Sequence, residues 1–238
     1  MLNAARRLLR RALPMPVRQA VALLRRGLTA RGQTYAKRAL AEPDESWPPI
    51  CTVEQPIKQS QYWEGKLHNL KIATAMVDGL NIAPGEVFSV WALIGRPTAK
   101  RGFAVGRAIR ADEETGDVGG GLCQLSGLIY ELGLRAGLEV IERHPHSRDL
   151  YSSEDERFTP LGLDATVVWP WKDLRLRNGL GVPLQLRCSV NRLTLHGELT
   201  APAALPGSEL TIERIDHSGG KHVSVWRGIQ WVSHDRYR

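Results

Sequence analysis

Three consecutive glycines that run directly into an amphipathic helix pattern constrain this chain more than any other feature. Gly119-Gly120-Gly121 precede Leu122-Cys123-Gln124. Apolar residues then recur every three or four positions, at Leu125, Leu128, Ile129, Leu132 and Ala136. This spacing is that of one face of an α-helix, and glycines before it permit positive φ angles and a close approach of backbone or ligand. The sequence therefore predicts a tight loop that opens a core helix near residue 122.

Cys123 falls at the start of this helix and off its predicted core face, about 200° around the axis from Leu125. Unpaired N–H groups and the positive end of the helix dipole favour a thiolate there and can hold an oxyanion. Gly119, Gly120, Gly121 and Gln124 would then form a substrate or oxyanion loop. Two interpretations stay open: a reactive or ligand-binding cysteine, and an inert residue at a tightly packed glycine turn.

Two histidines can return to Cys123 along the chain. A helix from Cys123 to Arg135 runs about 18 Å, and a strand over residues 138–144 returns about 20 Å. His144 or His146 can therefore act as a general base, and Asp164 either orients an imidazole or caps a turn. The histidines may instead be purely structural or share a metal site with Cys123. No strong zinc spacing is present, so we expect no metal and no cofactor.

The positive charge is concentrated at the N-terminus. Residues 1–41 hold ten Lys or Arg and no acidic residue, so the remainder has 22 basic and 25 acidic residues, a net charge of −3. The remainder therefore lacks the basic footprint of a nucleic-acid binder. Residues 1–41 read as two short basic amphipathic helices, the second with an apolar stripe at Val17, Ala20, Val21, Leu24 and Leu28. Such an arm either adsorbs to an anionic membrane surface or packs on the body with its arginines in solvent.

Export and disulfide signals are weak in this sequence. No apolar run approaches the roughly 18 residues that span a bilayer, and the first residues do not resemble a signal peptide. Three widely spaced cysteines argue against a disulfide framework. We expect a cytoplasmic protein, or one held peripherally on the inner face of the membrane.

The remaining pattern predicts an α+β fold, with helices in the N-terminal half, a mainly antiparallel sheet in the C-terminal half, and the cysteine-bearing helix at the core. Residues 42–60, with four prolines, are predicted to form a linker, and residues 61–238 one domain. A helix is expected from residue 62 to residue 79. Strands are expected at residues 87–94, 138–144, 165–169, 174–177, 184–190 and 193–199, with a last pair at 210–215 and 222–231.

The same residues carry a family resemblance. The matching motifs occur in order at residues 69–79, 84–89, 119–126, 143–146, 164–167 and 173–178. With them the chain resembles the VanW family, with a motif core at 69–178 followed by C-terminal strands at 184–231. The resemblance implies a role in peptidoglycan metabolism or glycopeptide resistance, because larger extracellular proteins with this domain are linked to L,D-transpeptidase activity.

In that mapping Cys123 is the nucleophile, His146 the preferred base, Asp164 the orienting group and His144 the alternative base. The implied substrate is a peptidoglycan stem peptide or a lipid-linked precursor. The competing hypothesis is a non-catalytic module that binds a precursor or a membrane partner.

Overall fold

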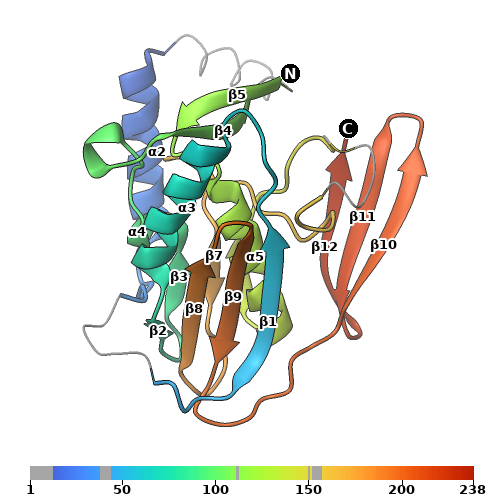
Figure 1. Cartoon of the computed structure of the whole chain (residues 1–238). Coiled ribbons are helices and arrows are strands. Elements are labelled where there is room, and N and C mark those ends of the chain that lie inside the picture. The colour runs from blue at the N-terminus through green and yellow to red at the C-terminus, as the bar shows by residue number, and fades with distance from the viewer. Residues whose placement is uncertain (1–12, 38–43, 111–112, 150, 152–156) are drawn as a thin grey trace.

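The computed structural model describes residues 13–37, 44–110, 113–149, 151 and 157–238, and it confirms the α+β class. Figure 1 shows the arrangement of the elements. The helices are α2 (Met15–Thr29), α3 (Trp63–Val77), α4 (Val90–Leu93) and α5 (Leu122–Ala136), with a short 3-10 helix η1 (Ala99–Arg101). The first of the two predicted arm helices lies outside the described residues.

The described strands pair antiparallel in four small sheets. The largest has the order β1 (Pro49–Pro56), β9 (Thr194–Thr200), β8 (Leu184–Val190) and β2 (Leu80–Ile82). A second has the order β3 (Val87–Ser89), β7 (Arg175–Arg177) and β6 (Glu139–Glu142). A third joins β10 (Leu210–His217), β11 (Gly220–Arg227) and β12 (Gln230–Tyr237), and β4 (Val105–Arg110) forms a hairpin with β5 (Glu113–Val118).

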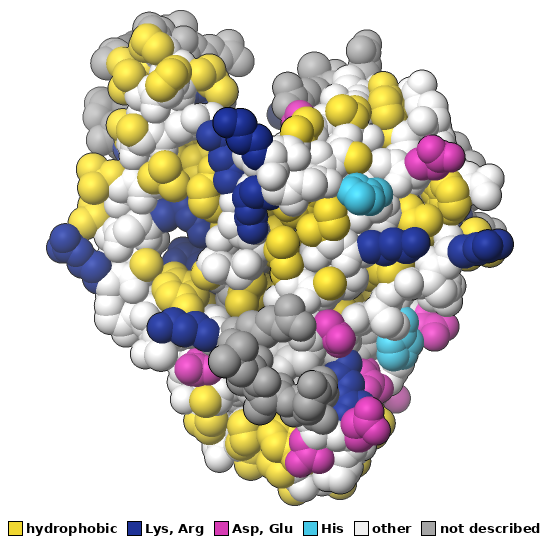
Figure 2. Space-filling view, turned by 60° about the vertical axis from the view of Figure 1, so that its left-hand side comes forward, with side chains coloured by type: hydrophobic (Ala, Val, Ile, Leu, Met, Phe, Trp, Pro, Cys, Tyr) yellow, Lys and Arg dark blue, Asp and Glu magenta, His cyan; other side chains and the backbone are white. Residues whose placement is uncertain are grey.

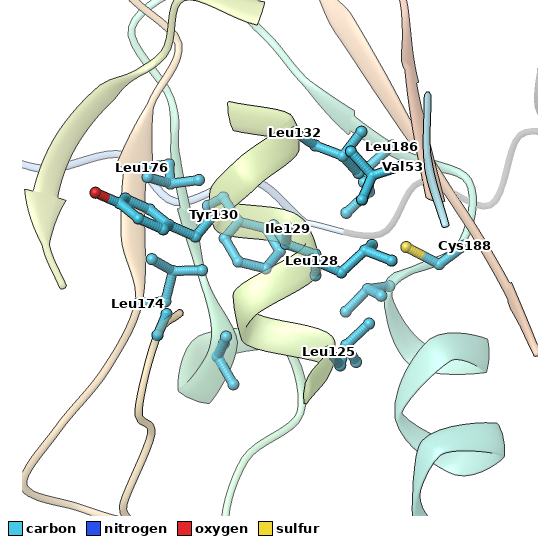
Figure 3. Close-up of a cluster of buried hydrophobic side chains, with 14 of the residues drawn as sticks. Val53, Leu125, Leu128, Ile129, Tyr130, Leu132, Leu174, Leu176, Leu186 and Cys188 are labelled. Atoms are coloured by element: carbon cyan, nitrogen blue, oxygen red, sulfur yellow. The ribbon is translucent and has the colours of Figure 1, made fainter. Parts of the chain in front are cut away.

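Helix α5 is the centre of the core and is buried along nearly its whole length. Figure 3 shows Leu128 and Leu132 pointing toward residues of the four-stranded sheet, with Leu174 and Leu176 on the opposite side of the helix. The backbone of β9 approaches so closely that a Cβ at Gly197 would lie 2.4 Å from Leu128. Each fully buried leucine contributes about 1.5–3 kcal/mol, and this packing fixes the position of the N-terminus of α5.

The predicted linker at residues 42–60 is wrong at Pro49–Pro56, because these eight residues form strand β1. β1 is an edge strand that pairs with β9 alone. Its two prolines stand at the strand ends, and prolines are tolerated at the ends and edges of sheets because no ladder hydrogen bond is lost there. Val53 and Gln55 are buried, so the segment belongs to the core.

Three predicted strands also differ from the structure. Residues 87–94 divide into β3 and helix α4, where the Ser89 side chain accepts a hydrogen bond from the Ala92 N–H and caps the helix. Residues 165–169 form no strand, only an isolated bridge at Val168. Residues 222–231 divide at the Gly228 turn into β11 and β12. In the first two cases an apolar run was long enough for one strand, and in the third a single glycine marks the turn.

Helix α2 contacts the body through its polar side. The Arg26 guanidinium donates to the Asp173 carboxylate at 2.9 Å and lies 5.7 Å from the Trp169 ring centroid. The stripe residues Val21 and Leu24 are 39% and 66% exposed. Helix α2 therefore does not pack its apolar stripe on the body with its arginines in solvent. Its apolar stripe is exposed, and Arg26 contacts the body.

Candidate active site around Cys123

The glycine loop is held by side chains from helix α3 and by the β4–β5 hairpin. Asn69, fully buried on α3, donates from Nδ2 to the carbonyls of Ala104 and Gly120, each at 2.9 Å. Its Oδ1 accepts from the Ala104 N–H at 2.8 Å. One amide side chain therefore ties the start of the hairpin to the loop before α5.

Two of the glycines are required by the geometry of this contact. A Cβ at Gly120 would lie 2.2 Å from the Gly106 carbonyl oxygen, so only glycine lets the hairpin backbone approach. Gly121 is the residue before α5 and has a φ of 102°, a region that L side chains rarely adopt. The sequence prediction of a tight, glycine-dependent helix entry is thus confirmed in detail.

Cys123 is the second residue of α5 and is half-buried beside the cavity described below. No side chain caps α5 among the described residues. The Gln124 N–H donates to the Gly121 carbonyl at 3.0 Å. The N–H groups of Leu122 and Cys123 have no intrahelical acceptor, so they offer donors and a positive dipole end beside the thiol. The Sγ atom lies 3.7 Å from the Val167 carbonyl oxygen, which fixes its position against the 164–168 segment.

His146 follows strand β6 and faces Cys123. Its Nδ1 lies 2.6 Å from Asp164 Oδ2, and the same carboxylate oxygen accepts the His146 backbone N–H at 2.6 Å. With Nδ1 engaged by Asp164, the Nε2 atom is left to interact with the Cys123 thiol, and each of the two groups shifts the pKa of the other. The structure therefore brings Cys123, His146 and Asp164 together in the order of a nucleophile, a base and an orienting carboxylate.

Asp164 is held by two further side chains that the sequence alone did not single out. Arg143 donates to Asp164 Oδ1 at 3.1 Å and forms a second ion pair with Asp235. The Tyr237 hydroxyl, on β12, donates to Asp164 Oδ1 at 2.5 Å. Arg143 lies in the motif at residues 143–146, three residues before His146, so its position in the sequence could have indicated a role in the site. Tyr237 lies on a strand 73 positions after Asp164, and no sequence pattern links the two residues.

These contacts set the charges of the site. Burial alone would raise the pKa of Cys123, but the hydrogen bond and the positive charge of His146 outweigh it and lower that pKa below its usual value. Burial opposes protonation of His146, while Asp164 and Cys123 together raise its pKa to about 10. Both shifts favour a thiolate–imidazolium pair near neutral pH, as in a cysteine paired with histidine for nucleophilic attack.

Asp164 stays ionised in spite of its burial. Burial would raise its pKa, and the hydrogen bond with His146 together with the charges of His146 and Arg143 holds the pKa well below the usual carboxyl range. The carboxylate is therefore available to stabilise a protonated imidazole at every pH at which the site operates.

The other predicted site residues have different partners. His144 Nε2 lies 2.9 Å from the Glu142 carboxylate, which also accepts a hydrogen bond from Arg175. The His144 ring is therefore paired with Glu142 and not with the thiol. Gln124 lines the same cavity, but its Nε2 donates to the Pro56 carbonyl at 3.0 Å. That amide therefore holds the end of β1 beside α5.

An open cavity of about 900 Å³ adjoins these groups. Its walls include the glycine loop, Cys123, His146 and Asp164, together with parts of α2, β4 and the 157–171 segment. Basic side chains are prominent on these walls, at Arg18, Lys66, Arg96, Arg107 and Arg148. The space is large enough for a peptide of several residues and is open beside the thiol.

The described residues contain neither a metal-binding cluster nor a helix that could span a membrane. No group of three or more His, Cys, Asp or Glu side chains there could hold a metal ion. No helix there is long and apolar enough to cross a bilayer.

A cysteine at an uncapped helix start, paired with a carboxylate-oriented histidine beside an open cavity, is the geometry of thiol-dependent acyl-transfer sites. The sequence profile of the family described as "VanW like protein" matches residues 65–200, more than half of the chain. The chain therefore belongs to the VanW family, and the matched region contains every residue of the Cys123 site except those supplied by α2 and β12.

Two curated relatives share this region. The chain is 31% identical over 163 residues to the "Vancomycin B-type resistance protein VanW" of Enterococcus faecalis, covering 67% of this chain and 59% of that protein. It is also 31% identical over 124 residues to the "Uncharacterized protein YoaR" of Bacillus subtilis, covering 52% of this chain and 39% of that protein. The matches thus span less than two thirds of either relative. No solved structure is significantly similar to the chain.

Proposed function

We propose that this protein is a cysteine-dependent acyltransferase that acts on peptidoglycan stem peptides, in the manner of an L,D-transpeptidase. The observation that carries the proposal is the Cys123–His146–Asp164 arrangement, with an Asp164–His146 distance of 2.6 Å and opposite pKa shifts on the thiol and the imidazole. The printed name of the Enterococcus relative, a vancomycin resistance protein, supports a role in cell-wall metabolism or glycopeptide resistance.

In the first half-reaction the Cys123 thiolate attacks a peptide carbonyl carbon and forms a C–S bond, while the carbonyl π electrons move to oxygen. The free N–H groups at the start of α5 stabilise that oxyanion. Collapse of the intermediate breaks the C–N bond, and the His146 imidazolium gives its proton to the departing amine. The product is a thioester on Cys123 and a neutral His146.

In the second half-reaction an acceptor amine attacks the thioester carbonyl and transfers a proton to His146. The C–S bond breaks, the Cys123 thiolate leaves, and a new peptide bond has formed. With water as acceptor the same steps give peptide hydrolysis. Asp164 keeps the His146 ring in one orientation through both steps, because it holds both Nδ1 and the backbone N–H of that residue.

The test is incubation with a panel of defined stem peptides and lipid-linked precursors, followed by intact-mass spectrometry. We expect an acyl adduct on Cys123 in the wild-type protein, which peptide mapping assigns to that residue. Cys123→Ala should lose the adduct with little change in melting temperature, whereas the control Cys51→Ala should keep it. If no peptide gives an adduct and binding of the same peptides survives Cys123→Ser, the protein is a non-catalytic binding module.

We also propose that α2 lies on an anionic lipid surface. Val17, Val21, Leu24 and Leu28 recur at helical spacing on one face, and each is at least 39% exposed. Arg26 lies about 180° from Val17 and is tied to Asp173 on the body, so the stripe faces away from the body. Figure 2 brings forward the side that carries α2 and shows hydrophobic side chains interspersed with Lys and Arg. This pairing of apolar and basic side chains matches an anionic interface.

Vesicle co-sedimentation tests this surface. The wild-type protein should bind vesicles that contain an anionic phospholipid, bind zwitterionic vesicles weakly, and lose binding as salt is raised. Leu24→Glu should reduce binding at least about tenfold, because a carboxylate opposes both burial and surface charge. Leu193→Glu, at an equally exposed leucine on the β8–β9 turn, is the control. Equal binding by both variants would contradict the proposal.

A further inference from the structure

We propose that Lys66, supported by Arg107, forms a subsite that binds a carboxylate of the substrate beside Cys123. This inference rests on the proposed function for its substrate class, a peptide that carries a free carboxylate near the carbonyl under attack. The site itself is defined by the two basic side chains and the cavity wall that they share with the cysteine.

Lys66 is a lysine enclosed by the site. It lies in the first turn of α3 and is only 3% exposed. A Cβ at Gly121 would lie 2.6 Å from its Cγ, so the Lys66 stem crosses the residue that opens α5. Lysines are almost never buried without a charged partner. The Lys66 side chain therefore runs along the glycine loop, two residues before the thiol.

The ammonium group belongs to a side chain that lines the cavity, and no ion pair joins it to a carboxylate of the described residues. Within the described part of the chain its one specific contact is the Phe158 ring, whose centroid lies 5.3 Å from Nζ. The nearby Glu114 is taken by Arg107, with Nε and Oε2 2.8 Å apart, and Arg107 also donates to the Tyr151 hydroxyl. A second cation beside Lys66 increases the demand for an anion.

The electrostatics agree with this geometry. Burial, followed by the charge of Arg107, lowers the pKa of Lys66 to about 8, and Glu114 opposes the shift. The lysine is therefore protonated at neutral pH, but at a cost that a bound anion would remove. A carboxylate is favoured because the Lys66 side chain packs on Gly121, the residue before α5, and so brings a cation beside the positive end of that helix. A peptide substrate carries its negative charge as a carboxylate.

The test measures binding in the Cys123→Ser background, so that turnover is not required. Calorimetric titration would compare a stem peptide with free carboxylates against the same peptide amidated at its C-terminus or at its internal carboxyl. We expect one amidated form to bind about 10- to 100-fold more weakly, the loss associated with one charge-assisted hydrogen bond. The form that binds weakly identifies which carboxylate is recognised.

Lys66→Met should abolish this preference while leaving the melting temperature equal or higher, because an unpaired buried charge is removed. Lys71→Met, at an exposed lysine on the same helix, should keep the preference. Equal binding of all three peptides by the parent protein, or a preference that survives Lys66→Met, would overturn the subsite. Failure of acyl transfer with the preference intact would sink only the proposed function.

Discussion

At the scale of single residues, the three cysteines differ in their chemistry because their surroundings differ. Burial raises the pKa of Cys51 to about 11, with weaker opposition from Arg135. Burial also raises the pKa of Cys188, which packs in the core. Cys123 alone has a histidine that reverses the effect of burial. The surroundings thus raise the thiol pKa at two positions and lower it at the third.

This contrast predicts selective alkylation. At pH 7, iodoacetamide should modify Cys123 at least about tenfold faster than Cys51 or Cys188, because the thiolate is the reactive form. The rate should also persist below the pH range in which an ordinary thiol titrates. Peptide mapping after timed quenching measures each site separately, and the other two cysteines serve as internal controls. Equal rates at the three sites would contradict the thiolate–imidazolium pair.

Asp164→Asn is expected to weaken the pair without removing either member. Loss of the carboxylate lowers the pKa of His146 from about 10, because Asp164 makes the largest favourable contribution to its protonation. The acid limb of Cys123 alkylation should then move to higher pH, since a neutral imidazole stabilises the thiolate less. Glu142→Gln, which removes the partner of His144, is the control and should leave that limb in place.

The structure places Cys123 at the start of α5, as the sequence predicts, but it does not support the helical-phase argument. Helical phase separated Cys123 from the leucine stripe, but α5 is buried on all sides, and Ser126 and Tyr130 on the cysteine's own face are buried too. The thiol is accessible because it lies at the end of the helix. The return path to His146 was predicted from chain lengths alone, while the role of Tyr237 required the fold.

At the scale of elements, the β4–β5 hairpin and α3 hold the entry of α5 in place. Asn69 joins the three at the Gly120 carbonyl. The sequence indicated the glycines but predicted no strand in residues 105–118, since Gly106 and a run of charged residues masked the strand pattern. A close approach of two backbones produces no periodic pattern of apolar residues, so the sequence of either segment does not predict it.

Gly120→Ala tests this junction. Its Cβ would lie 2.2 Å from the Gly106 carbonyl oxygen, so the hairpin and the helix entry must separate. We expect a loss of about 1–3 kcal/mol in unfolding free energy and slower alkylation of Cys123. Gly127→Ala, in α5 with its nearest neighbour at 3.6 Å, is the matched control and should preserve both, because alanine is favoured over glycine in a helix.

At the scale of the whole molecule, the candidate site is assembled from segments far apart in the chain. Asp164 receives bonds from Arg143 after β6 and from Tyr237 on β12, while Arg143 also pairs with Asp235 on β12. The C-terminal sheet is therefore a support for the site as well as a separate layer. The structure has strands where the sequence predicts them within residues 184–231, except that residues 222–231 divide at Gly228. The contact of β12 with Asp164 follows from packing that no local pattern indicates.

The pH dependence of the unfolding free energy tests the contribution of Asp164 and its partners. Because Asp164 has a depressed pKa in the folded protein, it contributes stability that is present above the unfolded carboxyl pKa of about 4 and is lost as the pH falls. Urea unfolding of the wild-type protein between about pH 5 and pH 3 should show a falling free energy. Asp164→Asn should show a shallower fall over the same interval, and an unchanged slope would rule out Asp164 as a main contributor.

The hydrogen bond from Tyr237 to Asp164 also orders events during synthesis. On the ribosome, Cys123 and His146 emerge well before β12, so for that interval the nascent chain carries both groups without the tyrosine and aspartate that hold Asp164 and Arg143. The fully supported thiolate–imidazolium pair can form only after residue 237 has been translated and β12 has docked. Full support of the candidate site is thereby tied to the docking of β12.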